Sequence, residues 1–220
     1  MKAVDIVQLG SVVACAAGLA LPGCGSGGIS GIETTNGDGS VSASVNRIQG
    51  TAPSFSRIYL STDTYTPVAG EGTARSTAAD ADGEFAFDSL APDSYTLVVS
   101  SPDSRFGALV KNIAVSETAD DSSRAFSLIA AGTITGTAES TQGDSTPVLV
   151  YLPGTALYTV VPSSGAFSLS PVPPGEYSIQ ASALSPSSDL QTPQVLSSSN
   201  RTSVTVRAGR TAGAGNLRIP

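Results

Sequence analysis

The side chains that could do chemistry here are mainly carboxylates, hydroxyls and two cysteines, because none of the 220 residues is histidine. Without an imidazole, the chain lacks the most common general base near neutral pH and a frequent zinc ligand. Its many serines therefore have no partner of the Ser–His type to activate them. We predict no catalytic residues, no cofactor and no enzymatic activity.

Three carboxylates are candidates for a cation site. Asp80, Asp82 and Gly83 match part of a calcium-binding loop, and Asp120 could add a further charge. The full loop spacing, which ends in a bidentate glutamate, is missing, and acidic residues beside glycine are common in turns. We therefore favour a solvated hairpin turn over a calcium site at these positions.

Tyrosines are the candidates for ligand binding. Sugar recognition commonly uses exposed aromatic rings surrounded by polar groups, and this chain has six tyrosines and no tryptophan. Tyr65 and Tyr158 fall near predicted loops, where their rings could face a polysaccharide. Tyr95 and Tyr177 occupy equivalent positions in predicted hairpins, so we expect them to pack in a core with a hydrogen-bonded hydroxyl. Tyr65 and Tyr158 are thus the predicted ligand-binding residues.

The formal net charge of −7 argues against nucleic acid as a partner. A polyanion would require a basic stripe, whereas the arginines of this chain are scattered. The same charge would keep the chain from an anionic membrane surface unless another anchor held it there.

The elements that would position these side chains are built around one stretch, Asp82–Ser100, which occurs twice. In each copy a glycine turn leads into a strand of alternating apolar residues, and a proline turn leads into a second strand. At an offset of 82 residues, Gly83, Phe85, Phe87, Leu90, Pro92, Tyr95 and Leu97 reappear as Gly165, Phe167, Leu169, Val172, Pro174, Tyr177 and Ile179. A hairpin with one apolar face must pack against a second sheet.

The repeat extends over most of the chain and divides it near Ile129. Further matches pair Ser40–Ser42 with Thr133–Thr135, Ile58–Leu60 with Val150–Leu152, Ile113 and Val115 with Val204 and Val206, and Phe126 and Leu128 with Leu217 and Ile219. An extra loop is expected in the first half, at about Thr66–Ser76. We predict an all-β chain with two tandem antiparallel β-sandwich domains of about seven strands each, at residues 39–129 and 130–220.

Both copies of the motif resemble the carboxypeptidase regulatory-like domain, through the residues just given together with Gly175. That family is similar to transthyretin-like and starch-binding-like β-sandwiches. The resemblance implies a fold, because the shared residues mark hairpins and core positions, and it transfers almost no function.

The N-terminal residues 1–23 resemble a bacterial lipoprotein signal peptide, since an apolar run ends in Leu21, Pro22, Gly23 and Cys24. The resemblance implies that Cys24 becomes the lipidated first residue of the mature chain, and the alternative is an ordinary cleaved secretory signal. Residues 24–38, rich in glycine and serine, would then form a flexible tether.

Because Gly25 replaces the aspartate that retains such proteins at an inner membrane, the resemblance implies the outer membrane or cell surface. The resulting prediction is a non-catalytic, lipid-anchored cell-envelope protein that acts as a structural or binding module, with an envelope protein or a polysaccharide as partner. The alternative is a carbohydrate-binding module that uses the loop tyrosines.

Overall fold

The computed structural model describes residues 35–67, 72–117, 122–141, 146–184, 195–199 and 201–220. These residues form sixteen β-strands and contain no helix, which confirms the all-β prediction. Within those ranges, no helical segment could therefore span a membrane. The predicted signal peptide, Cys24 and Asp120 lie outside the described residues, as does the predicted tether up to residue 34.

Eight strands belong to each half of the described chain. The first half contains β1 (Thr35–Ser44), β2 (Arg47–Thr51), β3 (Arg57–Thr62), β4 (Ala74–Ala78), β5 (Glu84–Asp88), β6 (Asp93–Ser100), β7 (Phe106–Val115) and β8 (Ser122–Ala130). The second half contains β9 (Gly132–Ser140), β10 (Val148–Tyr151), β11 (Tyr158–Val161), β12 (Gly165–Val172), β13 (Gly175–Leu184), β14 (Val195–Ser198), β15 (Thr202–Val206) and β16 (Thr211–Ile219).

The first half is a sandwich made by one continuous set of paired strands in the order β4-β3-β6-β7-β8-β1-β2-β5. Strands β7 and β8 pair only through Phe106 with Ala130 and Gly107 with Ile129, so two layers diverge from this short junction. Alternation along the strands sets the buried face. In β5, for example, Phe85 and Phe87 are buried in the core of this sandwich.

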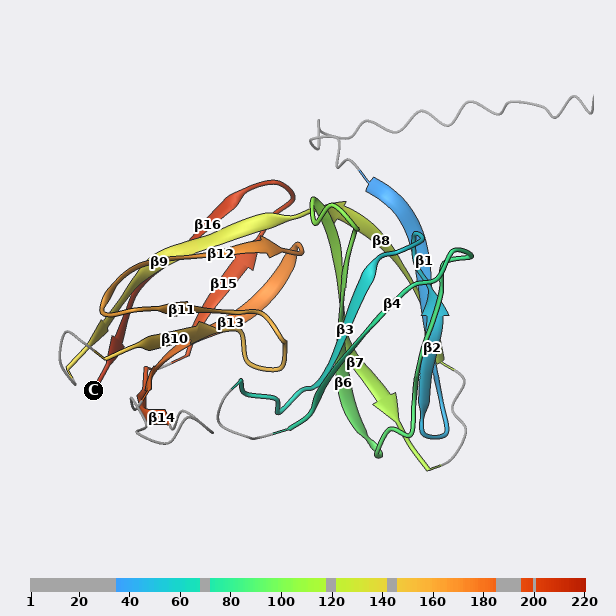
Figure 1. The fold of residues 1–220 in the computed structure, drawn as a ribbon, viewed down its shortest axis with the longest axis horizontal. Helices are drawn as coiled ribbons and strands as arrows, with labels where there is room; N and C mark the ends of the chain where they lie inside the picture. The colour runs from blue at the N-terminus through green and yellow to red at the C-terminus, as the bar shows by residue number, and fades with distance from the viewer. Residues whose placement is uncertain (1–34, 68–71, 118–121, 142–145, 185–194, 200) are drawn as a thin grey trace, which may run out of the picture. The chain divides into compact units, whose positions relative to one another are not determined.

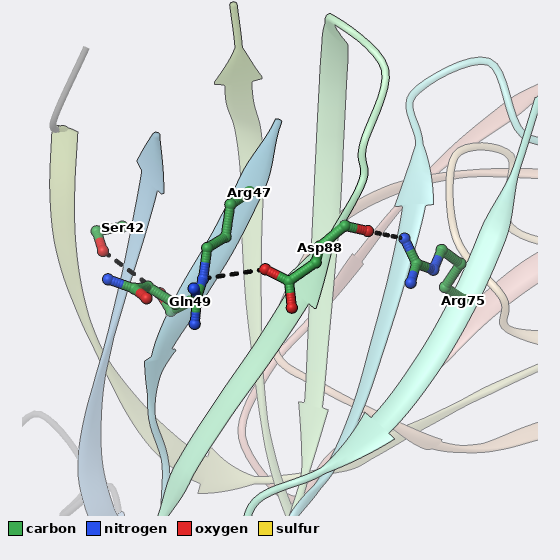
Figure 2. A network of polar contacts seen from close by, with 5 residues as sticks. All are labelled: Ser42, Arg47, Gln49, Arg75 and Asp88. Atoms are coloured by element: carbon green, nitrogen blue, oxygen red, sulfur yellow. Dashed lines mark hydrogen bonds and ion pairs between the residues drawn. The ribbon is translucent and has the colours of Figure 1, made fainter. Parts of the chain in front are cut away.

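The open edges of the first sandwich meet where β4 approaches β5. Figure 2 shows Arg75 of β4 donating a hydrogen bond from Nη1 to the backbone carbonyl of Asp88, at 2.5 Å. Arg47 forms an ion pair with the carboxylate of the same residue, with Nε 3.2 Å from Oδ1. Both side chains of that ion pair are largely exposed, so it adds little stability, and it joins β2 and β5, which are already neighbours in one layer. The Arg75 hydrogen bond joins β4 and β5, the last strands of the two layers.

The second half has its own sandwich and its own core. One layer has the order β11-β10-β13, with β14 and β15 both paired to β13, and the other has the order β12-β9-β16. Its core includes Ile134, Leu152, Phe167, Ile179 and Leu217, none of which belongs to the core of the first sandwich. The exact domain boundaries at residues 39, 129 and 130 stay predictions, although β1 already begins at Thr35.

The strand registers support most of the internal repeat but correct its first match. Gly50 of β2 lies opposite Phe85, and Gly136 of β9 lies opposite Phe167. In both pairs the phenylalanine ring packs on the glycine, where a Cβ atom would lie within 2.9 Å of the ring. Strand β2, and not β1, is therefore the counterpart of β9.

The expected match of Ser40–Ser42 with Thr133–Thr135 is consequently wrong. Strand β1 is an addition to the first sandwich, because it lies between β8 and β2 and pairs antiparallel with both. In the second sandwich, as far as the structure describes it, no strand takes this position, and β16 pairs directly with β9, in parallel. All other strand pairs in the described chain are antiparallel.

Candidate ligand pocket at the junction of the two sandwiches

The outer face of the first sandwich is buried along β3 and β6. Leu97 and Val99 of β6 face the core, so the alternation of the strand turns Val98 away from it. A side chain on the outside of a sandwich is normally exposed, yet Val98 is 1% exposed, as is Ser61 on the outward face of β3. Residues of the second half cover this face.

Gly154, in the loop between β10 and β11, makes two hydrogen bonds to the first half. Its N–H donates to the carbonyl of Tyr65 at 2.8 Å, and its own carbonyl accepts a hydrogen bond from Ser61 Oγ at 2.9 Å. Gly154 has φ +75°, and a Cβ atom there would lie 3.0 Å from the carbonyl oxygen of Asp63. Glycine suits this position because it combines a left-handed backbone with close approach to another chain segment.

A second set of contacts involves β7. Leu109 packs against the core of the second sandwich, and a Cβ atom on Gly107 would lie 2.8 Å from the ring of Pro173. Lys111, the only lysine after Lys2, donates from Nζ to the backbone carbonyl of Glu176 and lies 5.3 Å from the centre of the Tyr177 ring. These contacts extend the junction across three adjacent strands.

A pocket of about 290 Å³ opens at this junction. Strands β3, β6 and the loop after β6 supply one wall, and the segments before β11 and at the end of β12 supply the other. The lining residues are Arg57, Tyr59, Val98, Ser100, Ser104, Ala156, Leu157, Tyr158, Leu169, Ser170, Pro171 and Val172. The pocket therefore combines one guanidinium, two phenol rings, serine hydroxyls and apolar side chains.

The two tyrosines predicted to bind ligand lie on opposite sides of the junction and close to one another. Tyr158 begins β11, lines the pocket and is 53% exposed, so its ring can contact a bound molecule. Tyr65 does not line the pocket, and its backbone holds Gly154. Burial raises the pKa of the Tyr65 hydroxyl, and the neighbouring Tyr158 raises it further.

The two tyrosines expected in the cores are buried there. Tyr95 is 3% exposed and donates from its hydroxyl to the carbonyl of Ala91 at 2.9 Å. Tyr177 is 4% exposed and donates to the carbonyl of Pro173, four residues before it, at 2.7 Å. Each hydroxyl is thus hydrogen-bonded, as predicted, and its partner lies at the proline turn of its own hairpin.

The carboxylates considered for a cation site act in a hairpin turn. Asp80 Oδ1 accepts hydrogen bonds from the backbone N–H of Asp82, at 3.0 Å, and of Glu84, at 2.8 Å. Such a side chain stabilises a turn by satisfying its amides. Across the part of the chain that the structure describes, no group of three or more histidine, cysteine or acidic residues is arranged to hold a metal.

Arg57 and Tyr59 line the pocket without having been predicted from the sequence. Both alternate with Ile58 and Leu60, so the pattern shows only that they point outward. A signal for the covered face does exist in Leu97-Val98-Val99, because a continuous apolar run in a strand indicates burial on both faces.

Comparison with protein-family models and with curated proteins gave no match. Among solved structures, the chain is similar to GBS52, the minor pilin of the Gram-positive pathogen Streptococcus agalactiae. The identity is 13%, the match covers 78% of this chain and 85% of the pilin, and the TM-score is 0.28. It is also similar to the BSP domain of a biofilm-associated protein, with 12% identity, coverage of 73% and 27%, and a TM-score of 0.19.

Both TM-scores are below 0.5, so neither similarity assigns a function to this chain. The resemblance to carboxypeptidase regulatory-like domains stays a prediction.

Proposed function

We propose that this chain is a non-catalytic cell-envelope protein, attached to a membrane by lipid on Cys24, whose tandem β-sandwiches act as a structural or binding module. The observation that carries the proposal is the buried outer face of the first sandwich. Ser61 and Val98 are covered by the second half, and buried hydrogen bonds join the two halves at Gly154. Two sandwiches joined in this way can act as one unit that a lipid anchor and a tether hold at a membrane.

The anchor is tested by labelling cells that express the full chain with radioactive palmitate. We expect label in the wild-type protein and in Cys15→Ser, and loss of label in Cys24→Ser, because Cys24 and not Cys15 follows Leu21, Pro22 and Gly23 at the end of the apolar run. The Cys15→Ser variant is the matched control, since it changes the other cysteine of the chain. Equal labelling of Cys24→Ser and wild type would contradict lipid attachment at this residue.

The pocket favours carbohydrate binding as a second candidate function. Tyr158 presents a half-exposed ring beside Tyr59, and the serine hydroxyls of the same pocket could donate to and accept from sugar hydroxyls. Both tyrosine rings are accessible to a ligand in this structure, because Tyr158 is exposed and Tyr59 is half-buried.

Affinity electrophoresis through gels that contain neutral polysaccharides tests this candidate. We expect a polymer that slows the migration of the wild-type protein to leave the migration of Tyr158→Ala unchanged. The control is Phe55→Ala, which removes an exposed aromatic ring outside the pocket and should still be slowed. Retardation that survives in Tyr158→Ala would place sugar binding elsewhere on the protein.

A further inference from the structure

The residues that line the pocket carry a positive charge, whereas the chain as a whole is negatively charged. Among the described residues, Arg57 is the only charged one that lines the pocket, although the chain as a whole carries a formal charge of −7. No carboxylate of the described ranges lines the pocket. The nearest one in sequence, Asp103, accepts hydrogen bonds from Ser101 Oγ at 2.6 Å and from the N–H of Arg105 at 3.1 Å.

The guanidinium of Arg57 is free to bind a ligand. Among the residues that the structure describes, Arg47 and Arg218 form ion pairs, and Arg75 and Arg124 donate to backbone carbonyls. Arg57 is exposed and has neither kind of protein partner within those same ranges. Its strand position is nevertheless fixed, because β3 pairs with β4 on one side and with β6 on the other.

The residues around Arg57 are arranged for a molecule that is both anionic and rich in hydroxyls. Arg57 lies opposite Ser100 in the sheet, and Tyr59 lies beside it on the same outward face. Ser104 and Ser170 add hydroxyls, and Tyr158 adds an exposed ring from the second half. A volume of about 290 Å³ suits one small unit of a polymer better than an extended chain.

We propose that this pocket binds an acidic sugar unit, with the Arg57 guanidinium paired to the sugar carboxylate and Tyr158 in contact with the sugar ring. Arginine is suited to this role because its planar guanidinium binds a carboxylate through two parallel hydrogen bonds. The proposal rests on the carbohydrate-binding candidate and adds the charge of the ligand to it.

The test compares two ligands with the same sugar rings, the anionic trigalacturonic acid and its neutral methyl ester, by titration calorimetry with the chain from Gly25 to Pro220. We expect the wild-type protein to bind the acid about tenfold or more tightly than the ester, as a charged hydrogen-bonded pair implies. Arg57→Gln should abolish this preference. Arg218→Gln, which makes the same charge change at an exposed position outside the pocket, should preserve it.

Circular dichroism of each variant shows whether it is folded before its binding is compared. Equal binding of acid and ester by the wild type, with both lost in Tyr158→Ala, would overturn the acidic-sugar proposal and leave the carbohydrate-binding candidate standing. A preference for acid that persists in Arg57→Gln would also overturn it. If neither ligand binds the wild type, the acidic-sugar proposal fails. The carbohydrate-binding candidate fails as well if the neutral polysaccharides also do not slow the protein in affinity electrophoresis.

Discussion

Replacing Ser61 by alanine should destabilise the protein by about 1–3 kcal/mol. The side chain is 1% exposed, and its hydroxyl donates to the Gly154 carbonyl at 2.9 Å across the junction of the two halves. Alanine removes the donor and leaves the carbonyl of a buried residue without this partner, and leaving such a group unsatisfied costs about 1–3 kcal/mol.

The free energy of unfolding can be measured by urea denaturation, followed by far-UV circular dichroism and by tyrosine fluorescence, since the chain has no tryptophan. The matched control is Ser40→Ala in β1, where the hydroxyl makes an exposed hydrogen bond to Thr51 Oγ1 at 3.1 Å. This control should stay within about 0.5 kcal/mol of wild type. If Ser61→Ala does the same, Ser61 faces solvent and the hydrogen bond across the junction contributes nothing.

Further variants probe the turns and the sheets. Tyr95→Phe and Tyr177→Phe should each lower the free energy of unfolding by about 0.5–1.5 kcal/mol in urea, because each loses a hydroxyl-to-carbonyl hydrogen bond. Burial raises the pKa of Tyr177, so the folded state keeps its proton while the unfolded state ionises near pH 10. The stability from Tyr177 should therefore be complete below about pH 10 and fall as the pH rises further, and Tyr177→Phe should flatten this decline. Phe55 is 63% exposed and has φ +63°, a left-handed backbone that costs a non-glycine residue about 1–2 kcal/mol. Phe55→Gly removes this strain and adds about 0.5–1 kcal/mol of conformational entropy to the unfolded chain, so the melting temperature should rise. Gly50→Ala should be among the most destabilising single changes, because its Cβ atom would lie 1.9 Å from the Ser40 carbonyl oxygen, and thermal melting would measure the loss.

The hairpins could be predicted from the sequence because their physics is local. Alternation places Phe85 and Phe87 on one face of β5, and the proline turn places Tyr95 where its hydroxyl reaches back four residues. The same pattern in the second half gives Tyr177 the same contact. Repetition of a local pattern was therefore enough to predict two similar sandwiches.

The extra strand β1 could not be placed from the pattern alone. Val41 in β1 and Ile48 in β2 are both single apolar residues between polar neighbours, so either strand matches Ile134 of β9. The pairing of Gly50 with Phe85 decides between them, and this is a contact between strands that lie 35 residues apart in sequence. Strand register of this kind depends on tertiary packing.

The pocket was only partly predictable for a related reason. Tyr158 could be proposed from its place near a loop, whereas Arg57 and Tyr59 are ordinary outward-facing residues of a strand until the second half covers that strand. The covering depends on Gly154, and a glycine in a loop carries no sequence signal for the segment it will contact. Sites formed between two folded units are therefore poorly predicted from local patterns.

The central claim is that the second sandwich covers the outer face of the first, and thiol accessibility tests it most directly. The chain from Gly25 to Pro220 has no native cysteine, so Val98→Cys and Val160→Cys each introduce a single thiol. Because Val98 is 1% exposed and Val160 is 51% exposed, we expect the thiol at position 98 to react with Ellman's reagent about tenfold or more slowly than the thiol at position 160. Equal rates in the two folded variants would show that the outer face of β6 is open to solvent and would contradict the account.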